Sequence, residues 1–330
     1  MNFLAGKLFS DQGRHRKFLL FYVAGTGRQV HLSPNEGGSV ILIGENINVM
    51  SERLRKAMKE RDKGPIQEIA RASESSGIDY LDVNIGPARK DGPALMEWII
   101  TAIREVSKLP LSLDTTNIDA LKVGIEMESG NVIINSIQAT EERMEQLLPL
   151  MKQYHCKCIA LLIGKEGMPR DATERGALAA EFAAKVDEFG IPHGDVFFDP
   201  IVLPVAYQQD QVVNTLEFMK MFKEMLPDFS TTCGLSNVSN GVPENLRGLV
   251  NRTYLSMLMK YGLDSAIVDA FDKKLIAMAK KVDNEINMLI WNVMDNDIDI
   301  EKFTEEQKNY VKTVRILQGK SLYSHSWLKL

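Results

Sequence analysis

A short apolar run followed by a helical pattern recurs eight times along this chain, and this repetition restricts the fold more than any other feature of the sequence. Continuous apolar runs are typical of buried parallel strands. Eight strand–helix units over roughly 250 residues indicate an α/β fold of the TIM (β/α)8 barrel class. A doubly wound sheet is the alternative, but polar residues at nearly every strand end favour the barrel, where all strand ends meet at one mouth. We expect strands at residues 40–43, 80–86, 111–114, 132–136, 158–163, 196–200, 231–235 and 265–269.

Local signals indicate where several helices begin and end. Asp91 is placed to cap a helix, and Asp171 with Glu174 resembles a capping box at the start of another. Gly190 follows the apolar spacing of that second helix and is expected to end it, because glycine adopts the left-handed conformation at helix ends. The helical sequence that leads to Ser76 is expected to break near Gly64.

The barrel is expected at residues 40–290, between an N-terminal extension at 1–39 and a helical C-terminal extension at 291–330. Thr304 and Gln307 form a capping-box pattern in the C-terminal extension.

The apolar run 18–23 in the N-terminal extension follows basic residues as in a signal peptide, but no small-residue cleavage site closes it. Glu-Gly-Gly before Val40 can be encoded by a ribosome-binding sequence, and Val40 by a GTG start codon. We therefore hypothesise that the natural protein begins near Val40 and that the extension is disordered or translated leader.

Composition excludes several classes of function. The 330 residues carry a formal net charge of −5 without a basic stripe, which argues against a nucleic-acid partner. Cys156, Cys158 and Cys233 lack the Cys-x-x-Cys spacing of zinc and iron–sulfur sites, so we interpret them as buried thiols in a reducing, cytoplasmic compartment. No apolar run reaches the roughly 18 residues of a membrane span. The acidic run 295–299 resembles a calcium loop, but Ile300 stands where that loop needs glycine.

Polar side chains stand at the ends of the expected strands, where the active sites of barrels lie. Any one of them could instead cap the helix that follows, a role that Asp, Asn and Ser fill well. For the whole set this is a poorer explanation, because carboxylates inside a barrel mouth are costly unless they are paired or bind a ligand. This polar ring consists of Glu45, Asn46, Asp82, Asn84, Asp114, Asn135, Asp199, Ser236, Asn237 and Asp269.

The ring contains no histidine, and the sequence has no His-x-His or His-Glu-x-x-His pattern, which argues against a catalytic metal. Carboxylates and amides suit a neutral heterocycle rich in N–H donors, such as a 2-amino-4-oxo-pteridine. The amide of Asn237 offers both donors and an acceptor. It can therefore hold a ligand nitrogen whose protonation state changes during a reaction.

Six segments carry a specific resemblance, in order and at barrel spacing, between about residues 40 and 290. They are Gly-Glu-Asn-Ile-Asn (44–48), Leu-Asp-Val-Asn-Ile-Gly-Pro (81–87), Leu-Asp-Thr-Thr-Asn (113–117), Ile-Asn-Ser (134–136), Asp-Pro-Ile-Val-Leu-Pro (199–204) and Gly-Leu-Ser-Asn-Val-Ser (234–239). Together they resemble the methyltetrahydrofolate:corrinoid (iron–sulfur protein) methyltransferase family, of the pterin-binding barrel superfamily. Dihydropteroate synthase and the folate module of methionine synthase share that barrel. This chain lacks the synthase's Gly-Gly and Ser-Thr-Arg loop after the second strand.

The resemblance implies a role for each residue of the mouth. Asn237 would be the catalytic residue that reaches N5 of the folate, and Asp114, Asn135 and Asp199 would hold the pterin ring. Asn240 stands where the family has Gln, one methylene longer, and Arg247 is the counterpart of a basic residue that faces the substrate. The whole substrate-binding set is Asp82, Asp114, Asn135, Asp199, Gly234, Ser236, Asn240 and Arg247. A non-catalytic calcium that occurs in the family would lie near Gly262 and Asp264.

The resemblance also implies the reaction, a methyl transfer between N5 of tetrahydrofolate and cob(I)alamin. The chain lacks the Asp-x-His-x-x-Gly motif that binds corrinoids, so a separate corrinoid protein would supply the cobalamin. The acetyl-CoA pathway is one setting, and corrinoid-dependent demethylation, in which tetrahydrofolate accepts the methyl group, is the alternative. A non-catalytic folate-binding or corrinoid-partner protein is the alternative of another class. We further expect a cytoplasmic homodimer with no metal of its own in catalysis.

Overall fold

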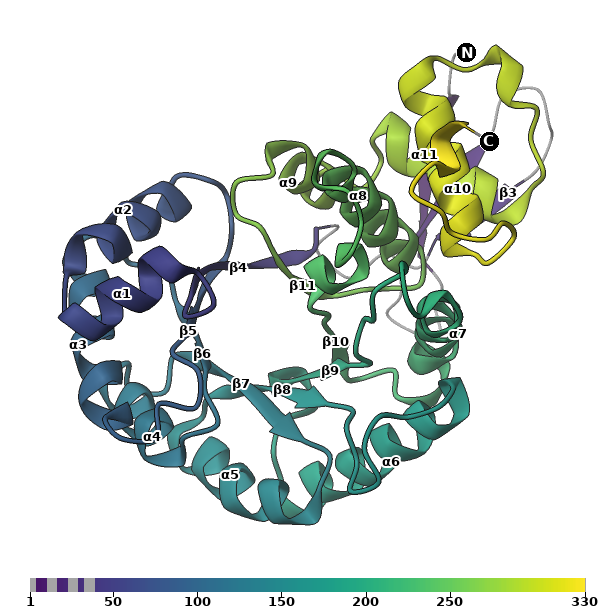
Figure 1. Ribbon diagram of the computed structural model, residues 1–330. Coiled ribbons are helices and arrows are strands. Elements are labelled where there is room, and N and C mark those ends of the chain that lie inside the picture. Colours follow the sequence, from purple (N-terminus) through teal and green to yellow (C-terminus); the bar gives the residue numbers. More distant parts are fainter. Residues whose placement is uncertain (1–3, 11–16, 23–28, 33–38, 330) are drawn as a thin grey trace.

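The computed structural model describes residues 4–10, 17–22, 29–32 and 39–329, with side chains described for 39–329. Eight parallel strands form one sheet in the order β10-β9-β8-β7-β6-β5-β4-β11. Figure 1 shows this sheet curved into a ring with the helices outside it, the (β/α)8 barrel that the sequence predicts. Its strands are β4 (Ile41–Asn48), β5 (Tyr80–Asn84), β6 (Leu111–Asp114), β7 (Val132–Gln138), β8 (Lys157–Leu161), β9 (Val196–Asp199), β10 (Ser230–Thr231) and β11 (Ser265–Val268).

The barrel is almost closed between β10 and β11, the two edges of the sheet. β11 pairs with β4 on one side. On the other side, the backbone N–H of Ile267 donates to the carbonyl of Cys233 at 2.8 Å, and Gly234 forms a bridge with Ile267. The contact with the segment after β10 is therefore short, but it leaves little of the sheet edge unpaired.

The expected seventh strand at 231–235 is wrong in its bounds. β10 ends at Thr231, and the 3-10 helix η2 (Leu235–Ser239) follows almost at once. Apolar side chains spaced two apart, such as those of Cys233 and Leu235, fit a strand or a tight turn equally over so few residues. Two other strands, β4 and β7, are longer than expected because each continues past a shift in its pairing register. The shift lies between Gly44 and Ile47 in β4 and between Ile134 and Ile137 in β7.

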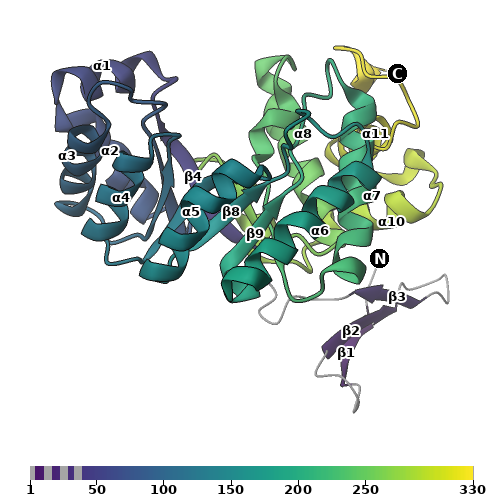
Figure 2. The same ribbon diagram turned by 90° about the horizontal axis from the view of Figure 1, so that it is seen from below.

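Helices surround the barrel in the order that the sequence predicts, and Figure 2 shows the same arrangement turned by 90°. The helices of the described residues are α1 (Glu52–Glu60), α2 (Lys63–Glu74), α3 (Gly92–Arg104), α4 (Ile118–Met127), α5 (Glu141–Tyr154), α6 (Ala172–Phe189), α7 (Gln209–Met225), α8 (Glu244–Lys260), α9 (Lys273–Lys280), α10 (Glu285–Asp295) and α11 (Glu305–Leu317). In the part of the chain that the structure describes, no helix combines the length and apolar character that a bilayer span requires.

Most of the predicted capping signals are confirmed. The side chain of Asp171 accepts from the backbone N–H of Glu174, and Gly190 ends α6 with a φ of 63°. Thr304 and its partner three residues on form the predicted capping box of α11. Asp91 stands at the N-cap of α3 as predicted, but its carboxylate forms an ion pair with Arg61 and makes no capping hydrogen bond.

The helical break expected near Gly64 lies slightly earlier, between α1 and α2. Asp62 caps α2 by accepting from the backbone N–H of Gly64 at 3.0 Å. Glycine therefore belongs to the first turn of the second helix, where an unpaired N–H is normal and can be capped.

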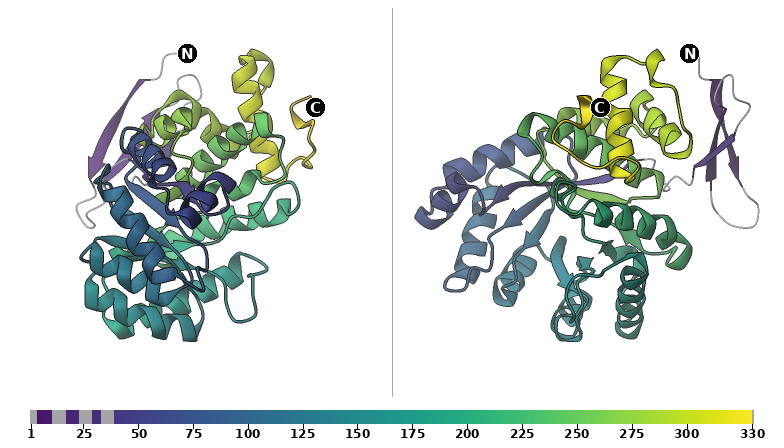
Figure 3. Two further views of the ribbon diagram at one scale, coloured as in Figure 1. Left: turned by 60° about the vertical axis from the view of Figure 1, so that its left-hand side comes forward. Right: turned by 45° about the vertical axis from the view of Figure 1, so that its right-hand side comes forward.

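The last two long helices of the described residues lie outside the barrel. α10 and α11 lie beside α8 in both Figure 1 and the two views of Figure 3. α10 spans residue 290, so the expected domain boundary falls inside a helix. In the expected N-terminal extension the structure describes a separate antiparallel sheet made of β1 (Leu4–Ser10), β2 (Lys17–Tyr22) and β3 (Gln29–Leu32). The Glu-Gly-Gly before Val40 lies outside the described residues, and the hypothesis of a start near Val40 stays a prediction.

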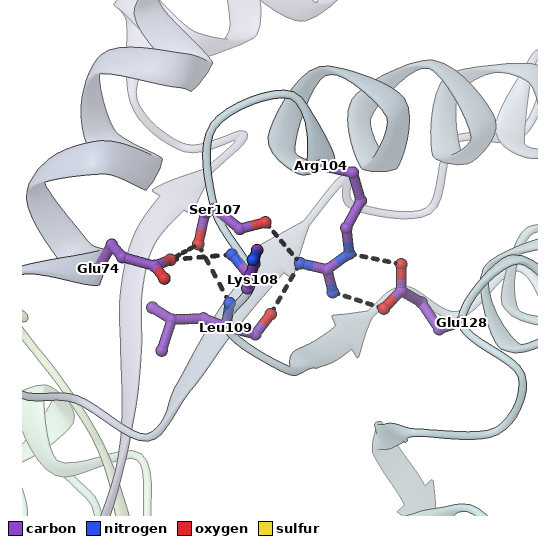
Figure 4. A network of polar contacts seen from close by, with 6 residues as sticks. All are labelled: Glu74, Arg104, Ser107, Lys108, Leu109 and Glu128. Carbon is purple, nitrogen blue, oxygen red and sulfur yellow. Dashed lines mark hydrogen bonds and ion pairs between the residues drawn. The ribbon is translucent and has the colours of Figure 1, made fainter.

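A polar network stabilises the end of the barrel where the strands begin (Figure 4). Arg104, the last residue of α3, donates to the carbonyls of Ser107 and Leu109 at 3.1 and 2.9 Å, and its guanidinium pairs with Glu128. Glu74, at the end of α2, accepts from the hydroxyl of Ser107. These contacts join the ends of three helices to the loop that enters β6. This end of a TIM barrel commonly serves stability rather than chemistry.

Candidate active site at the barrel mouth

The alternation of side chains along each strand puts the polar ring inside the barrel mouth. Ile43, Ile133, Ile159 and Phe197 form a small apolar cluster that is separate from the larger core between sheet and helices. Because strand side chains alternate, this cluster fills the barrel interior. Glu45, Asn135 and Asp199 each follow a member of the cluster by two residues. The ring therefore lies on top of an apolar floor.

Asp82 is a buried carboxylate at the centre of one side of the ring. It accepts from the hydroxyl of Ser112 at 2.6 Å and from the amide of Asn135 at 3.0 Å. Burial raises its pKa, and the neighbouring charge of Asp114 raises it further. Asp114 lies on the next strand, where burial also raises its pKa although the amide of Asn84 donates to it. The two carboxylates therefore disfavour each other's charge in the absence of a donor from outside the protein.

Asp199 is held by backbone groups at the end of β9. The N–H of Ile201 donates to its Oδ1 at 2.8 Å. Burial raises its pKa from 3.8 to about 6, against the lowering effect of the backbone N–H groups of Ile201 and Gly234 and of the charge on Arg175. A carboxylate with these partners keeps lone pairs free for a ligand.

Glu45 lies on β4, on the side of the mouth where the barrel closes. The hydroxyl of Ser236 donates to its carboxylate. The pKa of Glu45 is raised from 4.5 to about 7, chiefly by burial and less by the charges of Asp82 and Asp269, against the lowering effect of the Ser236 hydrogen bond and of Arg247. The sequence identified Glu45 as a member of the ring but gave it no role.

Asn46 and Asp269 have local partners that fix their side chains. The amide of Asn46 donates to Asp269 at 2.8 Å and accepts from the backbone N–H of Ala270 at 2.8 Å. The contacts of these two ring members are structural, although neither side chain caps the helix that follows its strand, because Ser51 and Asp272 stand at those helix starts. They join the first and last strands of the barrel.

The predicted catalytic residue Asn237 lies on η2 and is exposed at the rim of the mouth. Asn240 approaches it, with its amide nitrogen 3.5 Å from the side-chain oxygen of Asn237. Arg247, at the start of α8, donates to Asn240 and to the hydroxyl of Ser239 at 3.4 and 3.2 Å. The structure thus brings these predicted residues together.

Gly234 is needed at its position for space. A Cβ atom there would lie 3.0 Å from the amide nitrogen of Asn237, so a larger residue would require that amide to shift by a few tenths of an ångström. The glycine of the predicted set therefore acts through its neighbour, by leaving room for the Asn237 amide.

The expected calcium position has a different set of contacts. The carboxylate of Asp264 lies 2.7 Å from the ammonium of Lys223 and accepts from the backbone N–H of Thr231, also at 2.7 Å. Gly262 turns the chain with a φ of 85°. Within residues 39–329, no group of three or more His, Cys, Asp or Glu side chains is arranged to hold a metal ion.

A cavity at the other end of the barrel is separate from the ring. Tyr80 and Tyr154 line it together with Lys157 and Asp195. The two charged residues neutralise each other in an ion pair of 2.6 Å. Tyr80 and Lys157 begin their strands and Asp195 precedes β9, so the cavity lies at the opposite end of the barrel from the polar ring.

Two residues that support the ring were missed from the sequence. Ser112 precedes Asp114 by two residues, and this spacing on one strand face could have identified it. Arg175 lies behind Asp199 and is completely buried. It occupies a position between Ala172 and Ala179 on the buried face of α6. A charged residue inside such an apolar stripe is the signal that could have identified it.

Comparisons with known proteins agree with this geometry. A dihydropteroate synthase from Thermus thermophilus has the same fold, with a TM-score of 0.54, 17% sequence identity and coverage of 75% of this chain and 94% of that one. The methylcorrinoid:tetrahydrofolate methyltransferase of Eubacterium limosum is 25% identical over 239 residues, which are 72% of this chain and 88% of that protein. The methionine synthase of Mycobacterium tuberculosis is 27% identical over 300 residues, 88% of this chain.

The chain spans only 24% of that methionine synthase, so the likeness concerns one part of a much longer protein. Residues 44–269 match the family described as pterin binding enzyme. This match runs from within β4 to the residue after β11 and includes the whole polar ring. The chain therefore belongs to the pterin binding enzyme family.

Proposed function

We propose that this protein transfers a methyl group between N5 of tetrahydrofolate and the cobalamin of a separate corrinoid protein. The observation that carries the proposal is the buried carboxylate pair of Asp82 and Asp114, whose pKa values are raised. Among the described residues, no cationic side chain pairs with either of them. A ligand with several N–H donors and no negative charge in its ring supplies what they lack. The pterin ring of folate is such a ligand.

In this proposal the pterin lies on the apolar floor of the mouth. Asp114, Asn135 and Asp199 accept from and donate to its polar edge, and Asp82 orients Asn135 through the hydrogen bond of 3.0 Å. The other binding residues of the predicted set surround the ring at η2 and α8: Gly234, Ser236, Asn240 and Arg247. The support is their common position at one mouth.

Asn237 is proposed to act on the charge at N5. A folate nitrogen is a poor leaving group, so transfer of the methyl group requires a proton or a strong hydrogen bond at N5 as the carbon–nitrogen bond breaks. The amide of Asn237 is neutral and exposed at the rim, so it donates a hydrogen bond rather than a proton. Donors directed at charge that develops in the transition state raise kcat more than they raise affinity.

The corrinoid is proposed to come from a partner protein that covers the mouth. The name of the Eubacterium limosum relative describes transfer from a methylcorrinoid to tetrahydrofolate, which favours that direction here. Transfer from methyltetrahydrofolate, as in the acetyl-CoA pathway, would use the same site. The methionine synthase relative also supports methyl transfer, although this chain matches only a part of it.

Exposed apolar side chains surround the mouth where this partner would dock. They belong to four different loops that follow barrel strands, and such patches rimmed by polar groups mark interaction surfaces. This apolar rim consists of Met50, Met168, Tyr207 and Phe271, which are 80%, 39%, 75% and 46% exposed.

A cytoplasmic location and a homodimer complete the proposal. Three buried free cysteines support a reducing compartment, and the homodimer rests on the sequence resemblance alone.

The test is a rapid-mixing measurement of methyl transfer between 5-methyltetrahydrofolate and cob(I)alamin, followed by absorbance of the corrinoid. Asn237→Ala should lower the single-turnover rate by about 10²-fold, the scale of one lost transition-state donor, while the melting temperature stays near that of the wild type. Asn284→Ala is the matched control. Asn284 caps α10 far from the mouth by accepting from Asn287 at 2.9 Å, so this variant should lose stability and keep its rate.

Two results would contradict the proposal. Absence of methyl transfer by the wild-type protein in both directions, with folate still bound, would favour the non-catalytic alternative. A normal single-turnover rate in Asn237→Ala would remove the residue from the chemistry while leaving the pterin site in place.

A further inference from the structure

A turn of unusual conformation follows the proposed pterin ligand Asp199. Ile201, two residues later, has a φ of 66°, in the left-handed region. For a β-branched side chain this conformation is a real outlier, and it persists only when its surroundings enforce it. The turn exposes the N–H of Ile201 to Oδ1 of Asp199 at 2.8 Å. The unusual conformation and the carboxylate contact thus belong to one feature.

Two side chains hydrogen-bond to the backbone carbonyls of this turn, those of Pro200 and Ile201. Nε of Arg175 donates to the carbonyl of Pro200 at 2.8 Å. The hydroxyl of Thr215 lies 3.3 Å from the carbonyl of Ile201 itself. Arg175 comes from α6 and Thr215 from α7, so the two helices that flank β9 both hold this turn.

Arg175 is an energetically unfavourable residue to bury there. Its side chain is fully buried, and burial lowers its pKa. Nη2 donates to the side chain of Gln211 at 3.0 Å, but Nη1 has no hydrogen-bond partner among the described residues. Buried guanidinium groups are normally fully hydrogen-bonded, and a buried charge costs several kcal/mol unless it is well paired. An apolar side chain would fill a purely structural role without this desolvation cost.

We propose that Arg175 is a positioning residue for folate binding, which holds the Pro200–Ile201 turn so that Asp199 presents an ionised, oriented carboxylate to the pterin. This inference rests on the proposed function, because it takes Asp199 as a pterin ligand. Arg175 acts through the backbone N–H of Ile201 and, at longer range, through its own positive charge. It does not touch the substrate.

The other titratable groups around Asp199 do not replace the positive charge of Arg175. Burial raises the pKa values of the Cys233 thiol and the Tyr254 phenol, so both stay neutral. Asp171, at the start of α6, acts on Arg175, and Glu45 acts on Cys233; both are carboxyl groups. Loss of Arg175 would therefore raise the pKa of Asp199 from its value of about 6.

The test is the pH dependence of 5-methyltetrahydrofolate binding, measured by calorimetry from pH 5 to pH 8. In the wild type, affinity should fall as the pH drops through the pKa of Asp199. Arg175→Met should move this midpoint upward by about one pH unit, the lower end of the effect of one neighbouring opposite charge. Affinity at pH 5.5 should then fall about tenfold relative to the wild type, and the difference should be smaller at pH 8. Protonation of the ligand is common to all variants and cancels.

Two further variants make the result decisive. Arg175→Lys keeps the charge but cannot bond both Pro200 and Gln211, so it should move the midpoint in the same direction by less. If Arg175→Met does not fold, this variant decides the question. Arg104→Met is the matched control. It removes an arginine that, like Arg175, holds the backbone of a loop, here through two carbonyls at the opposite end of the barrel. It should therefore lose stability and keep the wild-type midpoint.

An unmoved midpoint in both Arg175 variants, with loss of stability equal to that of Arg104→Met, would show that Arg175 is only structural. Asp199→Asn separates this failure from that of the proposed function. Asp82 and Asp114 also titrate in this range in every variant, so Asp199→Asn should remove only one part of the pH dependence. If Asp199→Asn changes the pH profile in this way while the Arg175 variants do not shift it, the inference alone is wrong. If Asp199→Asn binds folate with the wild-type profile, Asp199 is not a pterin ligand, and the inference falls with that assignment.

Discussion

Replacing Glu45 by glutamine should stabilise the ligand-free protein at alkaline pH and leave its stability at acid pH almost unchanged. The pKa of Glu45 is raised from 4.5 to about 7, chiefly by burial. The folded state therefore binds a proton more tightly than the unfolded state does. Between these two pH values stability falls as the pH rises, and above about 7 the full cost of the buried charge is present.

The size of the effect follows from the same values. A change in the pKa of Glu45 from 4.5 to about 7 corresponds to a loss of at most about 3 kcal/mol in the free energy of unfolding at pH 8. Partial exposure of Glu45 to solvent reduces this loss. In the Glu45→Gln variant the new amide oxygen would still accept a hydrogen bond from Ser236, so the substitution removes the charge and keeps the contact. For a domain of this size we expect a gain in melting temperature of up to about 5 °C at pH 8. The gain should nearly vanish at pH 4.5, where the native carboxyl is already neutral.

The assay is thermal unfolding of wild type and Glu45→Gln at pH 4.5 and pH 8, without folate. Glu74→Gln provides a control of opposite sign. The hydroxyl of Ser107 lowers the pKa of Glu74, so its ionised form is the stabilising one, and that stability is lost as the pH falls through the lowered pKa. Glu74→Gln should therefore lower stability at pH 8 and less so at pH 4.5. An equal change at both pH values in Glu45→Gln would refute the explanation by burial of charge.

Three other outcomes are expected. Asp114→Ala or Asp199→Ala should each weaken folate binding by about 1.5–3 kcal/mol, the value of a hydrogen bond to a charged group, and unchanged affinity of both in calorimetry would remove the pterin assignment. Arg104→Met should lower the free energy of unfolding by about 3 kcal/mol, because Glu128 keeps a buried charge without its partner, and denaturant titration would show this while folate affinity stays constant. Tyr207→Ser should raise the KM for a corrinoid protein without changing the rate with free cob(I)alamin, and a KM equal to that of the wild type would place the docking surface elsewhere.

The barrel and its ring could be predicted because both depend on local pattern. The apolar run of β6 ends in Asp114 and that of β9 in Asp199, as a buried parallel strand that ends at a site requires. The bounds of β10 could not be predicted in this way. It has only two residues, and the chain after it is held by η2 and by the bridge of Gly234 to Ile267. Such contacts join residues far apart in the sequence, which no periodicity reports.

The sequence also left open which group each polar side chain would contact. Asp91 and Asp171 look alike as helix caps in the sequence and both stand at an N-cap, but only the side chain of Asp171 accepts a capping hydrogen bond. Arg61, at the end of α1, takes the carboxylate of Asp91 because α1 and α3 present these side chains to each other. An aspartate before a helix predicts a cap only while no cation competes for it, and the competing cation is supplied by the fold.

The alternation that builds the barrel also separates its stability from its function. Leu113 and Phe198 point outward into the core between sheet and helices, whereas their neighbours Asp114 and Asp199 belong to the mouth. Burial raises the pKa of both carboxyl groups, so each ionised carboxylate lowers the stability of the ligand-free protein. The outward apolar layer has to offset this cost, because it is the part of each strand that does not face the ligand. A site of buried carboxylates can persist in such a fold for this reason: every strand that carries a costly residue on its inner face also carries a stabilising one on its outer face.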